Sequence, residues 1–255
     1  MTIALFIRRL MLASLLLGIA ARATADERAL YIAAASDLAY CLPELERAFE
    51  RQRPGITIKT SFGASGNFVA QIRKGAPFDV FMSADESYPG ALVRESLAQA
   101  DTLLHYATGH IALWSAQPLP DINNGLMILT RPKFRRIAIA NPDHAPYGKA
   151  ARRALEAAGI WSAIDHKIVR GENITQTLQF VQSGHAEIGI VAVSLLKQPA
   201  LAGTRYFEIP QHYYAPIKQY AVVTRRGDWP IAREFVLFLA TPEAQAIFAR
   251  FGLKR

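Results

Sequence analysis

Short apolar runs typical of β-strands alternate along this chain with amphipathic segments typical of helices. The strand-like runs are residues 30–34, 56–61, 79–82, 110–114, 136–140, 167–169, 188–193 and 219–224. Helical patterns lie between many of them, at 65–74, 148–158 and 175–182 for example, and two more, at 231–239 and 242–250, end the chain. Thr241 before Pro242 is typical of a helix start. This alternation predicts right-handed β-α-β units on largely parallel sheets.

Residues 1–25 have the pattern of a secretory signal peptide. Arg8 and Arg9 precede an apolar run over 10–20, and Ala23-Thr24-Ala25 offers the small residues of a cleavage site. The run is shorter than the roughly 20 residues that span a membrane, so an uncleaved anchor is the weaker interpretation. The paired arginines leave both the general and the twin-arginine export routes open. We expect a periplasmic protein whose mature chain starts near Asp26.

The composition excludes several classes of function. The sequence has 29 Lys and Arg against 21 Asp and Glu, and removing the three arginines before Asp26 leaves 26 against 21, a net charge of +5. The basic residues are scattered among acidic ones, unlike those of a nucleic-acid-binding surface. The six histidines lack metal-ligand spacing, and the single Cys41 can form neither an intramolecular disulfide nor a thiolate metal site. We expect no metal cation and no cofactor.

Two turns that contain serine stand out because each closes a predicted strand and opens a helical pattern. Ser36 follows three alanines, and Ser65 lies in the turn at 61–67. A hydroxyl beside the free N–H groups of a helix start can hold an anion without a cationic side chain. Both turns lie at the carboxyl ends of strands, where such sheets bind ligands. The alternative is that both serines are ordinary helix N-caps.

Further candidate residues come from later turns of the same kind. Tyr147 opens the helical pattern that follows the strand at 136–140, and Ile174 precedes the one at 175–182. The structural alternative is that Tyr147 packs on its own lobe and Ile174 is a core residue. The sequence around Ser65 superficially suggests a hydrolase nucleophile turn, but Asn67 stands where that motif needs glycine. A secreted serine-dependent enzyme is therefore the minor alternative.

Five segments together resemble the periplasmic molybdate-binding proteins of molybdate ABC transporters. They are residues 34–36, 61–65, 75–85, 141–148 and 189–191, and the ordered set covers nearly the whole mature chain. The resemblance implies an α/β, two-lobed periplasmic solute-binding protein of type II. Each lobe would be a mixed, mostly parallel sheet flanked by helices, with the ligand cleft between the lobes.

The resemblance also implies a domain organisation and a function. Residues 26–108 with 218–255 would form lobe I and residues 109–217 lobe II, with crossings near Thr108 and Pro216. The ligand would be molybdate or tungstate, with no enzymatic activity. The partner would be a membrane permease with its ATPase subunit, and we expect a monomer. Sulfate and phosphate remain alternative ligands, because sulfate too accepts hydrogen bonds at every oxygen.

Carried over by position, the resemblance implies five ligand-binding residues. Ser36 and Ser65 would supply hydroxyl and amide donors, and Ile174 a backbone N–H, so that its side chain is incidental. Tyr147 would supply a donor from a helix start. Many members carry a tyrosine where this chain has Ala192, and the Tyr147 hydroxyl is expected to compensate.

The fifth residue, Asp37, sets a problem of charge. A carboxylate close to a dianion repels it, whereas a phosphate site uses such an acceptor for the proton that phosphate still carries. No Arg or Lys adjoins the site motifs to neutralise the carboxylate. We therefore expect Asp37 to turn its side chain outward in a first helical turn and to offer only its backbone N–H. An inward side chain would favour phosphate.

Overall fold

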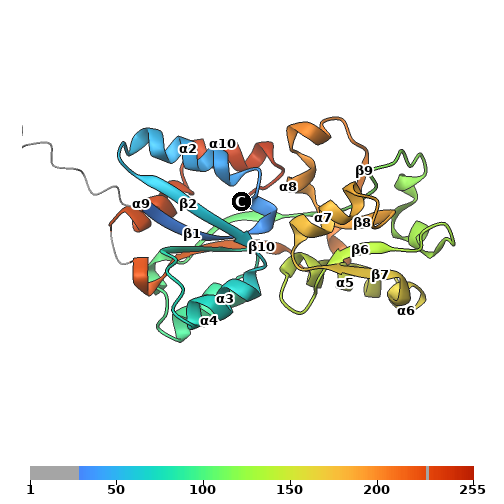
Figure 1. The fold of residues 1–255 in the computed structure, drawn as a ribbon, viewed down its shortest axis with the longest axis horizontal. Helices are drawn as coiled ribbons and strands as arrows, with labels where there is room; N and C mark the ends of the chain where they lie inside the picture. Colours follow the sequence, from blue (N-terminus) through green and yellow to red (C-terminus); the bar gives the residue numbers. More distant parts are fainter. Residues whose placement is uncertain (1–28, 228–229) are drawn as a thin grey trace, which may run out of the picture.

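Two five-stranded sheets lie side by side, each covered by helices (Figure 1). The computed structural model describes residues 29–227 and 230–255, so the predicted signal peptide lies outside the described residues. None of the helices in these two ranges is long and apolar enough to cross a membrane. We call the body around the first sheet lobe I and the body around the second lobe II.

The sheet of lobe I has the strand order β2-β1-β3-β10-β4. Its strands are β1 (Ala29–Ala35), β2 (Thr57–Gly63), β3 (Val80–Ser83), β4 (Leu104–Gly109) and β10 (Ile217–Val223). Its helices are α2 (Leu42–Gln52), α3 (Ser65–Arg73), α4 (Ser87–Arg94), α9 (Pro230–Phe238) and α10 (Pro242–Arg250), with the short 3₁₀ helices η1 (Ser36–Leu38), η2 (Ala100–Thr102) and η7 (Arg225–Gly227).

The sheet of lobe II has the order β7-β6-β8-β5-β9. Its strands are β5 (Ile111–Trp114), β6 (Ile137–Ala140), β7 (Ile168–Gly171), β8 (Ile188–Ala192) and β9 (Tyr206–Glu208). Its helices are α5 (Pro146–Ala157), α6 (Trp161–Ile164), α7 (Ile174–Gln182) and α8 (Val193–Leu196), with the 3₁₀ helices η3 (Ile122–Thr130), η4 (Asp165–Lys167), η5 (Pro199–Leu201) and η6 (Gln211–Tyr213).

The two sheets share one mixed plan, in which four of the five strands run in the same direction, as the resemblance implied. In lobe I, β1 pairs in parallel with β2 and β3, while β10 is antiparallel to β3 and β4. In lobe II, β6 pairs in parallel with β7 and β8, while β5 is antiparallel to β8 and β9. The strands β5 and β10 enter from the other lobe and therefore run in the reverse direction. The two-lobed α/β architecture is confirmed.

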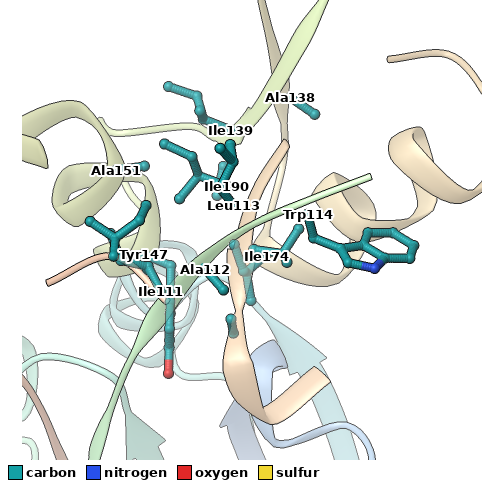
Figure 2. Packing of buried hydrophobic residues seen from close by; sticks show 14 of the residues in the cluster. Ile111, Ala112, Leu113, Trp114, Ala138, Ile139, Tyr147, Ala151, Ile174 and Ile190 are labelled. Atoms are coloured by element: carbon teal, nitrogen blue, oxygen red, sulfur yellow. The ribbon is translucent and has the colours of Figure 1, made fainter. Parts of the chain in front are cut away.

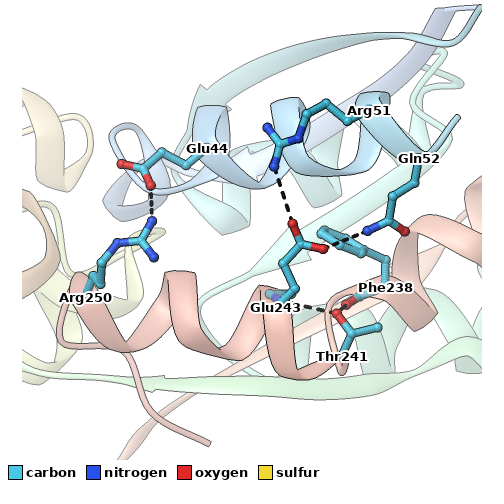
Figure 3. A network of polar contacts seen from close by, with 8 residues as sticks. Glu44, Arg51, Gln52, Phe238, Thr241, Glu243 and Arg250 are labelled. Carbon is cyan, nitrogen blue, oxygen red and sulfur yellow. Dashed lines mark hydrogen bonds and ion pairs between the residues drawn. The ribbon is translucent and has the colours of Figure 1, made fainter. Parts of the chain in front are cut away.

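Each lobe has its own apolar core. In lobe II the buried cluster includes Trp114, Ile139 and Ile190, and Tyr147 extends from it with its oxygen at the far end (Figure 2). In lobe I, α2 and α10 pack side by side and are joined at their surface by polar contacts (Figure 3). The α2 residue Gln52 donates to Glu243 at 2.7 Å, and Arg250 pairs with Glu44.

The predicted helix start at Thr241 is confirmed. The Thr241 hydroxyl accepts the Ala244 N–H at 3.3 Å, and Pro242 occupies the first helical position. A proline fits there because its missing N–H would have had no intrahelical partner.

Candidate functional site

The parallel strands of both lobes end at the boundary between the lobes. In lobe I, β1 is followed by Ser36, β2 by the turn to Ser65, and β3 by Ala84. In lobe II, β6 leads to the start of α5 and β7 to the start of α7. The predicted location of the serine turns at strand ends is therefore confirmed. Polar groups from five segments meet here.

The two serines are not helix N-caps. Ser65 is the first residue of α3, Ser36 is the first residue of η1, and neither helix has a side-chain cap hydrogen bond. The Ser65 Oγ instead accepts the Ala84 N–H at 3.1 Å, and the Ser36 Oγ accepts the Thr175 N–H at 3.4 Å. Because each oxygen accepts, its own hydrogen is available to donate to another group. Both side chains are buried.

Backbone donors at three helix starts remain available beside these hydroxyls. In α7 the Asn173 side chain caps the Gln176 N–H at 3.0 Å. Among the described residues, no group accepts the Ile174 N–H in that first turn. The Ser65 N–H of α3 and the Tyr147 N–H of α5 likewise have no acceptor within the described ranges. First-turn N–H groups lack intrahelical partners and favour negative charge.

The lobes contact one another directly around these donors. The Gly66 N–H donates to the His144 carbonyl at 3.0 Å, and the Thr175 hydroxyl donates to the Ser36 carbonyl at 2.7 Å. The Asn67 amide donates to Glu172 Oε1 at 2.6 Å. These contacts join lobe I to the turns before α5 and α7 and to the first turn of α7, so the structure represents a closed form of the cleft.

The Asp37 side chain points inward, and the outward expectation was wrong. Its Oδ2 accepts the Tyr147 hydroxyl at 2.9 Å and the Gln219 amide at 2.6 Å, and the residue is 1% exposed. The Ser194 hydroxyl donates to the Asp37 carbonyl at 2.8 Å. The reason is that α5 and β10 supply neutral donors to the carboxyl, which the sequence neighbours of Asp37 could not show.

Burial changes the acid–base behaviour of this cluster. Loss of hydration raises the pKa of the Asp37 carboxyl from 3.8 to about 7, although the hydrogen bonds from Gln219 and Tyr147 lower it. Burial, and then the nearby Asp37, raise the pKa of Tyr147 well above its usual value. Tyr147 therefore stays a hydroxyl donor at neutral pH, and it donates to Asp37. Its hydroxyl is thus already bonded within the protein, while its backbone N–H has no acceptor among the described residues.

Several residues that hold the site together were missed in the sequence. Gln219 lies in β10, 182 positions from Asp37, and also donates to the Tyr147 oxygen at 3.0 Å. Gly109 ends β4, and a Cβ there would lie 2.1 Å from the Tyr147 oxygen, so only glycine leaves room for this contact. Thr175 and Ser194 bond to the backbone of η1. The one sequence signal that could have pointed to this cluster is the polar Gln219 within an apolar strand.

An open groove of about 350 Å³ adjoins the buried donors. Its lining includes Ala84 and Pro146, which neighbour Ser65 and Tyr147, and it carries charges of both signs. Lys149 and Arg153 come from α5, and Asp85 and Glu86 from the opposite lobe. The Lys149 ammonium donates to the Tyr88 hydroxyl at 3.2 Å across the lobe boundary. The donors are thus buried, and the groove beside them is open to solvent.

Two mixed sheets of this topology, with a donor-lined site at the boundary between them, define a two-lobed solute-binding protein. The chain belongs to the bacterial extracellular solute-binding protein family, whose model matches residues 30–254. The resemblance found in the sequence is confirmed.

Named relatives cover most of this chain. It is 37% identical to the molybdate-binding protein ModA of Azotobacter vinelandii over 87% of this chain and 88% of that protein. It is 36% identical to the molybdate-binding protein ModA of Rhodobacter capsulatus over 94% of this chain and 92% of that protein. The solved structure of the Azotobacter vinelandii periplasmic molybdate-binding protein matches with a TM-score of 0.83 and 33% identity, over 89% of this chain and 99% of that one.

Proposed function

We propose that this chain is a periplasmic binding protein that captures molybdate or tungstate and delivers it to the permease of an ABC transporter with its ATPase subunit. Ser36, Ser65, Tyr147 and Ile174 would hold the oxyanion, with Asp37 beside them. The observation that carries the proposal is the convergence of hydroxyl and first-turn N–H donors from both lobes on one buried place. The relatives named for molybdate binding support the choice of ligand.

The physical mechanism is a match of donors to acceptors. A fully deprotonated oxyanion accepts hydrogen bonds at every oxygen, so neutral donors replace its hydration shell without a cationic side chain. Lobe closure then buries the anion between both sets of donors and creates one surface from two lobes for a permease to bind. We propose that the chain crosses between the lobes near residues 108 and 216. Lobe I, residues 26–108 with 218–255, would then move against lobe II, residues 109–217. The protein would act as a monomer.

Phosphate is the second candidate, and the inward carboxyl of Asp37 is the observation that favours it. An ionised carboxyl would accept the proton that hydrogen phosphate carries at neutral pH. Sulfate shares the charge and the acceptor pattern of molybdate, so the protein can distinguish these two anions only by the size of the closed cleft.

The enzyme alternative lacks a base at Ser65. A serine nucleophile needs a general base within hydrogen-bond reach. Within the described residues, the one hydrogen bond of the Ser65 Oγ is that with the Ala84 N–H. The ring of His144, in the adjoining turn, bonds to the Glu172 carbonyl at 3.0 Å. We propose binding without turnover.

Calorimetric titration of the mature chain with molybdate, tungstate, sulfate and phosphate tests the proposal. We expect tight one-to-one binding of molybdate and tungstate and weak binding of sulfate. Preference for sulfate or phosphate would keep the fold and reject the ligand. No binding of any of the four would reject the oxyanion function and return attention to a serine enzyme or an organic ligand.

A further inference from the structure

The buried carboxyl of Asp37 is the part of the site that donor matching leaves unexplained. Both of its hydrogen bonds, from the Tyr147 hydroxyl and the Gln219 amide, go to Oδ2. Its Oδ1 is buried and has no partner among the described residues. An unpaired buried charge is costly, whereas a carboxylic acid with its proton on Oδ1 would have a donor to offer.

The groups around this residue are neutral. Tyr147 on α5 and Gln219 on β10 bond to the carboxyl itself, Tyr106 on β4 bonds to Gln219, and Cys41 after η1 lies near enough to interact with Asp37 electrostatically. Thr175 on α7 and Ser194 on α8 bond to the backbone carbonyls of Ser36 and Asp37. Burial raises the pKa of Tyr106 and of Cys41 as well as that of Tyr147. No Lys, Arg or His of the described residues pairs with Asp37. Asp37 is therefore the member of this cluster that changes charge near neutral pH.

We propose that Asp37 is a neutral carboxylic acid in the ligand-bound protein, and that its Oδ1–H is a donor to the bound dianion. The inference rests on the proposed function and deepens it. The balance is simple: an Asp37 carboxylate, one proton from solvent and a dianion combine, so that the closed site holds a charge of −2 rather than −3. No other bond forms or breaks.

The direction of the pH effect follows from this balance. In this closed form burial brings the pKa of Asp37 to about 7, and a dianion beside it raises that pKa further. Below the pKa of the free protein the proton is present, so affinity does not depend on this group. Above it, each binding event must take a proton from solvent, so affinity falls about tenfold per pH unit. Hydrogen phosphate brings its own proton and would bind to ionised Asp37 without any uptake.

The test is calorimetric titration of the mature wild-type protein with sodium molybdate at pH 8.5, in buffers that differ in ionisation enthalpy. The dependence of the binding enthalpy on the buffer gives the number of protons taken up. We expect a value near one, and a dissociation constant that rises about tenfold between pH 8 and pH 9. Binding with no proton uptake would overturn the inference and leave the proposed function intact. Absence of any oxyanion binding would overturn both.

Two variants assign the proton to its residue. Asp37→Asn replaces the acid by an amide that can donate but cannot titrate, so proton uptake should fall to near zero and affinity should lose its pH dependence. Asp165→Asn, at an exposed carboxylate of lobe II, is the matched control and should keep the uptake of the wild type. Uptake that persists in Asp37→Asn would place the proton on another group and would contradict the inference. If Asp37→Asn fails to fold, the wild-type proton number alone decides.

Discussion

Lobe I brings side-chain hydroxyls and one backbone N–H group to the boundary, whereas lobe II brings backbone N–H groups. Ser36 and Ser65 of lobe I keep hydroxyl hydrogens available, while Tyr147 and Ile174 of lobe II are buried in the apolar core and present their amides. The same strand-end geometry therefore uses two kinds of donor. The contrast teaches that a residue's type reveals its role in one lobe and conceals it in the other.

The largest expected effect comes from blocking the approach of the lobes. A Cβ at Gly66 would lie 2.9 Å from the His144 carbonyl oxygen across the boundary. Gly66→Ala should weaken molybdate binding about 100-fold, or about 3 kcal/mol, because the lobes cannot reach this closed form. Calorimetric titration measures the loss, and the melting temperature of the free protein should change little.

Gly90→Ala is the matched control for that clash. It lies within α4, where a Cβ would meet only the flexible end of Arg94 at 3.5 Å. Equal affinity of Gly66→Ala and Gly90→Ala would show that binding does not require the lobe contact at Gly66.

The next largest effect is expected at the hydroxyls of lobe I. Ser36→Ala and Ser65→Ala should each weaken binding by about 1–3 kcal/mol, because each removes a hydrogen bond to a charged ligand. Titration of each variant measures the change, with Ser183→Ala on the surface of lobe II as the control. Wild-type affinity in both site variants would show that the two hydroxyls do not bind the ligand.

A smaller effect, but one with a distinct signature, is expected at the tyrosine of lobe II. Tyr147→Phe removes a hydrogen bond that lowers the pKa of Asp37, so that pKa should rise further. The pH at which molybdate affinity begins to fall should therefore move upward, while affinity at pH 6 changes by about fivefold or less. Titrations from pH 6 to pH 9 measure this profile.

Tyr213→Phe, elsewhere in lobe II, is the control for Tyr147→Phe and should keep the wild-type profile. If that pH moves downward in Tyr147→Phe instead, the result would contradict the hydrogen bond from Tyr147 to Asp37.

The smallest effect on affinity is expected at Ile174. Because the proposed donor is its backbone N–H, Ile174→Val should change affinity by about twofold or less and should cost about 0.5–1.5 kcal/mol of unfolding free energy. Titration and thermal unfolding separate the two quantities, with Ile188→Val in β8 as the core control. A tenfold loss of affinity at Ile174→Val would show that the side chain itself shapes the site.

Much of the fold could be predicted because its signals are local. The apolar runs at 30–34 and 136–140 became β1 and β6, and the helical patterns at 65–74 and 242–250 became α3 and α10. The strands β4 and β9 were missed, since β4 mixes polar and apolar residues and β9 has three residues. The sheets are mixed, as expected, but which strand of each sheet runs in the reverse direction was not predicted, because strand direction depends on where the chain crosses between lobes.

The sequence by itself determined the order of most strands and helices, the serine turns at strand ends and the family, because periodicity and ordered motifs are properties of neighbouring residues. Only the tertiary structure decided that Asp37 turns inward, that the Tyr147 hydroxyl is committed to it, and that Gly109 leaves room for their contact. The physical reason is that a buried carboxyl needs donors to replace water. Those donors come from Tyr147 and Gln219, on elements more than a hundred positions away.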